Sequence, residues 1–165
     1  MVKSEIEIED KYLRSIGLIV VSFSALESAV SEWINSLLLT EGQLGEIVTA
    51  EMSFRAKVTL ASSLCRYKFK DSKRLEKLDK LLRRLQQAEC MRNDVVHSYW
   101  GFSTGEIRAR RSKKTAKIKT GLRFHFQEMT VDELNEIADF IGNVVYDVVL
   151  FEGHMYDGEP WFETG

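Results

Sequence analysis

The stretch that decides the fold is DSKRLEKLDKLLRRLQQAECMRNDVVH, residues 71–97. Its first half repeats leucines at spacings of three and four, the pattern of a helix face that packs against a core: Leu75, Leu78, Leu82 and Leu85. The positions that continue this face are Glu89, Arg92 and Val96, so two charges stand where leucines are expected. A buried ion pair gains little over apolar packing. We therefore expect a long helix whose last part leaves the core and faces a cleft or a second subunit.

Two further helical segments precede this stretch. The first runs from about residue 9 to residue 40 and carries an apolar seam over three heptads, at Ile16, Ile19, Phe23, Leu26, Val30, Trp33 and Leu37, which Val20, Ile34 and Leu38 widen. The second runs from about residue 44 to residue 69, with an interruption expected near residues 51–53. Arg55 projects away from its apolar face, either as a solvated charge or as a contact for a phosphate.

After residue 97 the pattern changes to β structure, expected over about residues 99–127. Leu122, Phe124 and Phe126 alternate with polar residues, as in a half-buried strand. The opposing strand is expected at Ile107 and Ala109, with a basic segment at or near the connection. A capping box formed by Thr130 and Glu133 then opens a last helix, and about residues 153–165 form an acidic tail.

The composition is typical of a single soluble domain. The 165 residues, 44% hydrophobic and 29% charged, suffice for one core, and a single proline favours long helices. No signal peptide is recognised, and the longest apolar run, around residues 16–21, is too short to span a bilayer, so we expect a cytoplasmic protein without membrane contact. Cys65 and Cys90 are expected to be buried free thiols.

These elements predict a mainly α fold in one domain over residues 1–165. The expected architecture is a four-helix up-down bundle with a small β-hairpin or meander inserted between the third and fourth helices.

The end of the third helix combines side chains suited to cleaving RNA without a metal or other cofactor, because RNA supplies its own nucleophile, the 2′-hydroxyl group. The imidazole of His97 can transfer a proton near neutral pH. The guanidinium of Arg92 can stabilise charge on phosphoryl oxygens, and the amide of Asn93 can orient the ring or the substrate. Arg92 and His97 differ by about 140° around an ideal helix. A shared site therefore needs either a helix that ends by His97 or a symmetric dimer that brings two motifs into one cleft.

The pattern Arg92-Asn93-x-x-x-His97 on the third helix of a bundle resembles the R-polar-x3-H signature of the HEPN superfamily (higher eukaryotes and prokaryotes nucleotide-binding domain). The resemblance covers about residues 10–150. It implies an endoribonuclease that forms a homodimer through the Arg92–His97 face, acting as a toxin or abortive-infection effector beside an antitoxin or a small nucleotidyltransferase. Family members that have lost activity and bind nucleotides or proteins give the alternative.

A basic segment follows the motif, although the net charge of the chain is −2. Residues 108–119 carry seven basic residues and no acidic one. Such a segment can present a phosphate-binding surface, or it can be a solvated, mobile loop. Six of its residues are candidates for holding the backbone of single-stranded RNA: Arg108, Arg110, Arg111, Lys113, Lys114 and Lys117.

The leading hypothesis from the sequence is a metal-independent endoribonuclease that leaves a 2′,3′-cyclic phosphate. His97 would be its general acid or base, Arg92 its phosphate-stabilising cation and Asn93 its orienting group. One alternative is a non-catalytic HEPN-like module, and another is a bundle that binds nucleic acid through the basic segment alone. In a purely structural alternative, Arg92 and His97 only cap and pair at a helix end.

Overall fold

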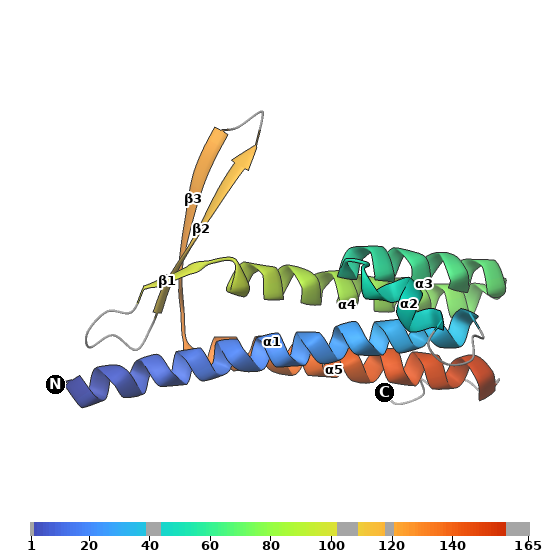
Figure 1. Cartoon of the computed structure of the whole chain (residues 1–165), viewed down its shortest axis with the longest axis horizontal. Helices are drawn as coiled ribbons and strands as arrows, with labels where there is room; N and C mark the ends of the chain where they lie inside the picture. The colour runs from blue at the N-terminus through green and yellow to red at the C-terminus, as the bar shows by residue number, and fades with distance from the viewer. Residues whose placement is uncertain (1, 39–43, 102–108, 118–120, 158–165) are drawn as a thin grey trace.

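A computed structural model describes residues 2–38, 44–101, 109–117 and 121–157, with the backbone alone for residues 2–9, 109–117, 121–125 and 154–157. The fold is mainly helical, as the sequence predicts (Figure 1). The helices are α1 (Val2–Leu38), α2 (Leu44–Ala50), α3 (Phe54–Lys68), α4 (Ser72–Val96) and α5 (Val131–Asp157). Between α4 and α5 lie the strands β1 (Tyr99–Gly101), β2 (Ala109–Lys117) and β3 (Gly121–Met129).

The helix boundaries follow from capping residues in the sequence. The predicted interruption of the second segment is confirmed, since α2 ends at Ala50 and the hydroxyl of Ser53 accepts the backbone N–H of Ala56 to open α3. At α4, the carboxylate of Asp71 accepts two free N–H groups. The capping box at α5 is also confirmed, because the Thr130 N–H donates to Glu133 at 2.6 Å and the Glu133 N–H donates back at 3.1 Å.

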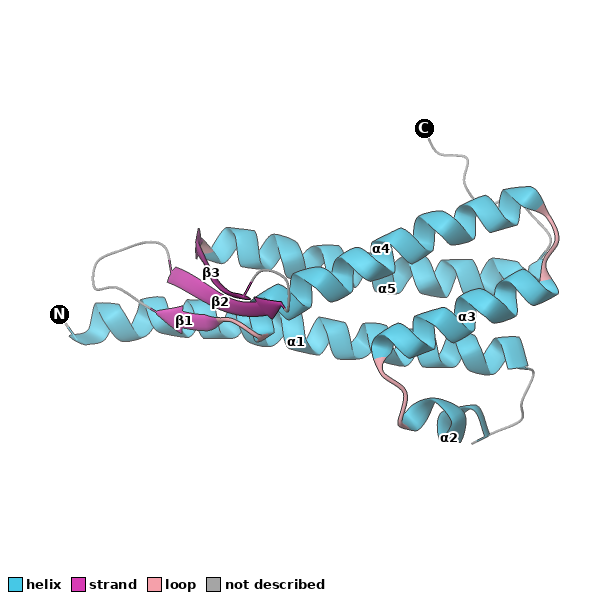
Figure 2. Cartoon of the chain, turned by 90° about the horizontal axis from the view of Figure 1, so that it is seen from above, coloured by secondary structure: helices cyan, strands magenta, loops and turns pink. Residues whose placement is uncertain are grey.

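Helices α1 and α5 run side by side in the same direction along the length of the molecule (Figures 1 and 2). Near their beginnings the Tyr12 hydroxyl donates to the Met129 carbonyl at 2.8 Å. Near their ends the rings of Trp33 and Phe151 meet edge to face, with centroids 5.4 Å apart. Helix α4 and the strands that follow it bring the chain back to the end of the molecule where α1 begins, so α5 starts there.

Helix α3 also runs parallel to α1, so the expected up-down alternation of the helices is wrong at this point. Phe23 of α1 packs on Phe54 at the start of α3, with ring centroids 4.8 Å apart, whereas Trp33 is the neighbour of Cys65 near its end. The physical reason is α2, which carries the chain back along α1 before α3 begins (Figure 2). A Cβ on Gly45 of α2 would overlap the Asn35 side chain, so glycine permits this close return.

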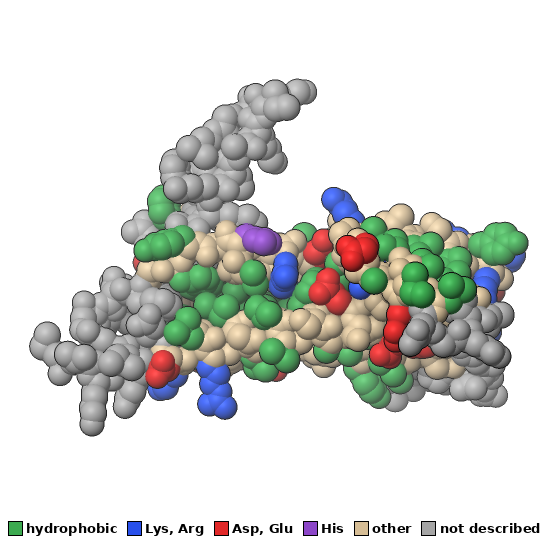
Figure 3. All heavy atoms as spheres, in the orientation of Figure 1, with side chains coloured by type: hydrophobic (Ala, Val, Ile, Leu, Met, Phe, Trp, Pro, Cys, Tyr) green, Lys and Arg blue, Asp and Glu red, His purple; other side chains and the backbone are tan. Residues whose placement is uncertain are grey.

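The core lies between α1, α3, α4 and α5, and most of the predicted seam of α1 is buried: Ile19, Phe23, Leu26, Val30, Trp33, Ile34 and Leu37. The placement of Val20 in this seam is wrong, because its side chain is exposed together with those of Leu13, Leu18 and Val21. Since α3 covers α1 only from about Phe23 onward, the first half of α1 keeps an uncovered apolar surface (Figure 3).

The length and composition of α1 bear on the expectation of a protein without membrane contact. The stretch Asp10–Leu38 is, by length and composition, long and apolar enough to cross a bilayer. One third of the apolar window is buried against the other helices, and the core helix of a soluble protein passes the same test. This finding is therefore weak evidence about where the protein resides.

The basic segment forms a strand and not a connection, which corrects the sequence expectation. β2 itself contains Arg110, Arg111, Lys113, Lys114 and Lys117, and it pairs antiparallel with β1 on one side and β3 on the other. β2 and β3 project away from the helices, whereas β1 continues from the end of α4 (Figure 1).

Candidate active site at the end of α4

Helix α4 ends at the motif that the sequence singles out. His97 is the C-cap residue, with φ −95° and ψ 16°, and its backbone N–H still donates to the Asn93 carbonyl at 3.1 Å. The indole N–H of Trp100 donates to the Val95 carbonyl at 3.0 Å and so caps the last turn. The helix therefore ends where a site shared by Arg92 and His97 requires it to end.

Arg92 lies on the buried stripe of α4, which the sequence pattern located only approximately. The buried residues of this stripe are Leu78, Leu81, Leu85, Ala88 and Val95, so the stripe turns away from Glu89 and Val96. Arg92 falls between Ala88 and Val95 at heptad spacing and is half-buried. A cation therefore occupies a core position at the edge of the helical packing.

Two contacts hold the guanidinium of Arg92. Its Cζ lies 5.0 Å from the ring centroid of Phe23 on α1, and its Nη1 donates to the amide oxygen of Asn93 at 2.9 Å. Its Nε is buried without a hydrogen-bond partner. Because a guanidinium has five N–H donors, several remain for a bound anion. Asn93 thus orients the arginine, whereas the sequence suggested that it orients the histidine or the substrate.

The imidazole of His97 is exposed and makes no hydrogen bond or ion pair with the part of the chain that the structure describes. It is the one histidine whose side chain is described, and Figure 3 shows it in purple beside the apolar surface of α1 and α4. No hydrogen bond joins the imidazole of His97 to Arg92 or Asn93 within the described part of one chain. The ring is therefore accessible to a substrate or to a second subunit.

A polar groove between α3 and α4 leads away from the motif. Its volume is about 300 Å³, and it is lined by Arg55, Val58, Thr59, Ser62, Ser63, Leu82, Gln86 and Glu89. Glu89 and Arg92, whose spacing would allow an ion pair, form none, since Arg92 turns to Asn93 and Glu89 faces the groove. Glu89 therefore does leave the core for a cleft, as the charge on the leucine stripe predicts.

The backbone of the basic strand lies close to the motif. Tyr99, two residues after His97, pairs with Ser112 in the middle of β2, and β2 in turn places Lys113 opposite His125 of β3. The pairing of β1 with β2 therefore brings the backbone around Arg111 and Lys113 beside the end of α4. Arg108 lies outside the described residues, and the side chains of the other five candidates in the segment are not described.

The cysteines take no part in this site. Cys65 is buried as expected, and burial raises the pKa of its thiol to about 12, so it stays protonated and unreactive. Cys90 is exposed, contrary to the expectation of two buried thiols. It lies on the face of α4 that the neighbouring helices leave open.

The sequence missed one contact of the site, the ring of Phe23. Phe23 was assigned to the core, and nothing in the sequence pairs it with Arg92, because the two are far apart in the chain and meet only through the packing of α1 on α4. Arg55 was considered mainly as a solvated charge. An arginine at the start of a helix, after a serine N-cap, is the only local signal that marks it.

Among the residues with described side chains, no group of three or more histidines, cysteines and carboxylates lies close enough to hold a metal ion. No protein-family model, no curated protein and no solved structure matches this chain. The geometry at the end of α4 is therefore the basis for a functional assignment.

Proposed function

We propose that this protein is an endoribonuclease of HEPN type that cleaves single-stranded RNA by attack of the 2′-hydroxyl group on the adjacent phosphate. In this proposal the four long helices form a HEPN-like four-helix bundle with the β strands inserted before the last helix. The guanidinium of Arg92, anchored by Phe23 and Asn93 but with free N–H donors, is the observation that carries the proposal.

The chemistry assigns a separate task to each side chain. Arg92 binds the phosphoryl oxygens and stabilises the charge that develops on them. Asn93 positions the guanidinium through its amide oxygen. His97 takes the proton of the 2′-hydroxyl or gives one to the leaving 5′-oxygen. The 2′-oxygen bonds to phosphorus as the bond to the 5′-oxygen breaks, so one fragment ends in a 2′,3′-cyclic phosphate and the other in a 5′-hydroxyl. None of these steps needs a metal ion.

A symmetric homodimer completes the proposed site. The uncovered surface of α1 contains Leu13, Val20 and Val21, whose exposed fractions are 53%, 39% and 67%. Val20 lies one helical turn before Phe23, whose ring carries Arg92. Burying this surface against a second copy would place two motifs beside each other, so that His97 of one copy serves the phosphate bound by the partner. Val21→Arg should shift the oligomeric state to monomer in analytical ultracentrifugation.

The biological setting is a corollary of this proposal. A metal-independent endoribonuclease in the cytoplasm suits a toxin or abortive-infection effector, kept in check by an antitoxin or a nucleotidyltransferase partner. The basic strand β2 would hold the RNA backbone beside the motif, which predicts binding that weakens as salt rises.

The decisive test is RNA cleavage in excess chelator by the wild type and by His97→Ala. The variant should cut about 10²- to 10⁴-fold more slowly with unchanged thermal stability, because the imidazole has no partner in the described structure. The exposed Lys80→Ala on α4 is the matched control and should keep the wild-type rate. Equal rates for wild type and His97→Ala would refute the proposal.

A non-catalytic module is the second candidate, and it is favoured by the absence of a hydrogen bond between the side chains of His97 and Arg92 in the described part of one chain. In that case the same face binds a nucleotide or a partner protein. The chain would then form a dimer that cleaves no RNA at any protein concentration, and Arg92→Ala would weaken ligand binding.

A further inference from the structure

The groove between α3 and α4 is joined to the candidate site by two separate routes. Along α4, Glu89 lies three residues before Arg92, or about 4.5 Å along the helix axis, and four residues before Asn93. Across the helices, the ring of Phe23 touches both Arg92 and Phe54, the residue directly before Arg55. One end of the groove, at Glu89, therefore lies within about one helical turn of Arg92, which does not itself line the groove.

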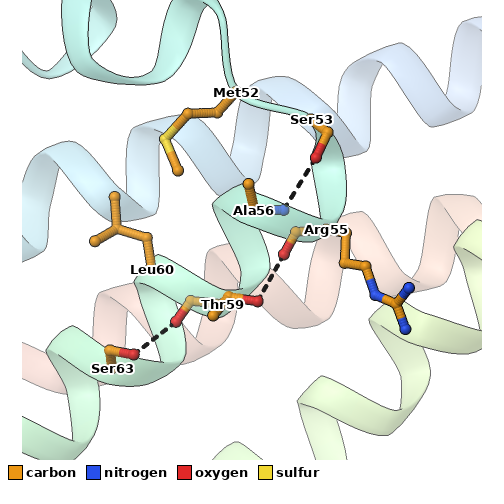
Figure 4. A pocket seen from close by; sticks show the side chains of 7 residues that line it. All are labelled: Met52, Ser53, Arg55, Ala56, Thr59, Leu60 and Ser63. Carbon is orange, nitrogen blue, oxygen red and sulfur yellow. Dashed lines mark hydrogen bonds between the residues drawn. The ribbon is translucent and has the colours of Figure 1, made fainter.

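Arg55 stands on the ridge of α3 that borders the groove. Arg55 also lines a second, more apolar hollow on the other side of the ridge, where Figure 4 shows its side chain reaching away from Met52 and Leu60. The guanidinium reaches instead toward α4 and the groove. It makes no ion pair or side-chain hydrogen bond with the residues that the structure describes, so its charge is available to an anion.

Glu89 faces the same groove and is also without an ion-pair partner among the described residues. A cation and a carboxylate that line one groove without pairing to each other suit a ligand with a negative part and a part that donates hydrogen bonds. Gln86 and Ser62 add further polar groups to the lining. A nucleotide has this combination, because its phosphate is an anion and its base carries N–H donors.

We propose that the groove between α3 and α4 is a subsite for the nucleotide next to the cleaved bond, in which Arg55 binds a phosphate and Glu89 accepts hydrogen bonds from the base. A carboxylate with two acceptor oxygens favours guanine, since its Watson–Crick edge presents two adjacent N–H donors. This inference rests on the proposed ribonuclease function and adds a base preference to it.

The phosphate contact is tested with His97→Ala as the background, so that the RNA stays intact. Binding of short labelled oligoribonucleotides is measured by fluorescence anisotropy over a series of salt concentrations. Arg55→Gln should lower the affinity about tenfold and reduce the slope of log K against log salt by about 0.7, the value for one phosphate contact to a single strand. The matched control is Arg83→Gln, which removes an exposed arginine of α4 outside the groove.

The base contact is tested with oligonucleotides that differ only in one base at either side of the cleaved position. The His97→Ala chain should bind the guanine-containing oligonucleotide about fivefold or more tightly than the others. Glu89→Gln should remove most of this preference without changing the salt slope, whereas Glu136→Gln, an exposed charge on α5, should leave it intact.

The outcomes separate the two proposals. If wild type cleaves RNA but Arg55→Gln and Glu89→Gln behave like their controls, the subsite is refuted and the ribonuclease assignment stands. If wild type neither binds nor cleaves RNA, both fall together. Circular dichroism of each variant checks that the chain is folded before binding is interpreted.

Discussion

Two arginines of α4 stack on phenyl rings in nearly the same way. The Cζ of Arg84 lies 5.3 Å from the ring centroid of Phe140 on α5, and the Cζ of Arg92 lies 5.0 Å from that of Phe23 on α1. Each ring covers one side of a guanidinium and draws it toward the core. Stacking alone therefore does not distinguish the two residues.

Their polar partners differ. Arg84 forms an ion pair with Asp147 of α5, so its charge is neutralised and ties two helices together. Arg92 is held by the neutral amide of Asn93, so its charge remains for an anion from outside the chain. Helix α4 therefore carries a structural cation, Arg84, in its middle, and near its end a cation, Arg92, whose charge can bind an anion. The predictions below test that distinction.

The largest effect is expected on the rate of RNA cleavage when each of the two arginines is replaced by glutamine. Arg92→Gln should lower the rate of RNA cleavage about 10²- to 10³-fold, because a donor to the phosphoryl oxygens is lost. Arg84→Gln should keep the wild-type rate per folded molecule. Single-turnover cleavage at saturating enzyme measures both. A similar loss in the two variants would mean that Arg92 acts only through the fold.

Asn93→Asp converts the surroundings of Arg92 into those of Arg84. The new carboxylate would neutralise the guanidinium and repel the phosphate, so RNA affinity and cleavage rate should each fall about tenfold. The control Asn143→Asp makes the same charge change at an exposed position of α5. Unchanged affinity in Asn93→Asp would show that Arg92 does not bind the anion.

For the free energy of unfolding the order should be reversed, with the larger loss expected in the Arg84 variant. Arg84→Gln should lower the free energy of unfolding by roughly 1–2 kcal/mol, because it leaves the half-buried carboxylate of Asp147 without its cation. Arg92→Gln should change it by less than about 0.5 kcal/mol, since the lost stacking is offset by removal of a buried, unpaired N–H group. Urea denaturation measures both, and equal losses would contradict the comparison.

The smallest effect concerns pH. Burial raises the pKa of the Asp147 carboxyl above its ordinary value, and the attraction of Arg84 opposes the shift only in part. The folded state therefore holds this proton more tightly than the unfolded chain does. The contribution of Asp147 to the free energy of unfolding therefore falls as pH rises from the ordinary pKa to the raised one. Above the raised pKa the free energy of unfolding stays at this lower value.

Asp147→Asn should remove this dependence. The difference in unfolding free energy between the variant and the wild type should grow in favour of the variant as pH rises through that window. Denaturant titrations at several pH values measure it. A difference that is constant with pH would show that the carboxyl pKa is not raised.

Local sequence signals located most of the helical fold. The seam from Ile19 to Leu37 is buried, the break near residues 51–53 is present, and the Thr130–Glu133 box opens α5. Each of these depends on residues a few positions apart, whose interactions are the same in almost any fold. The stripe of α4 was placed one position off at Leu82, Glu89 and Val96, since the buried residues are Leu81, Ala88 and Val95.

The errors share one cause, which is contact between distant segments. Val20 has the apolar character of a core residue but is exposed, because the shorter α3 does not reach it. The direction of α3 depends on how α2 returns along α1, and no local pattern encodes that return. The basic residues after Ile107 look like a loop in sequence, yet pairing with β1 and β3 makes them a strand.

The sequence by itself determined the mainly helical class and the helix ends, because capping and apolar periodicity act over one or two turns. It also identified Arg92, Asn93 and His97 as the residues to examine. Only the tertiary structure decided what surrounds them, namely the ring of Phe23, the groove with Arg55 and the uncovered face of α1. These depend on helix packing and direction, and such long-range contacts become visible only when the chain is folded.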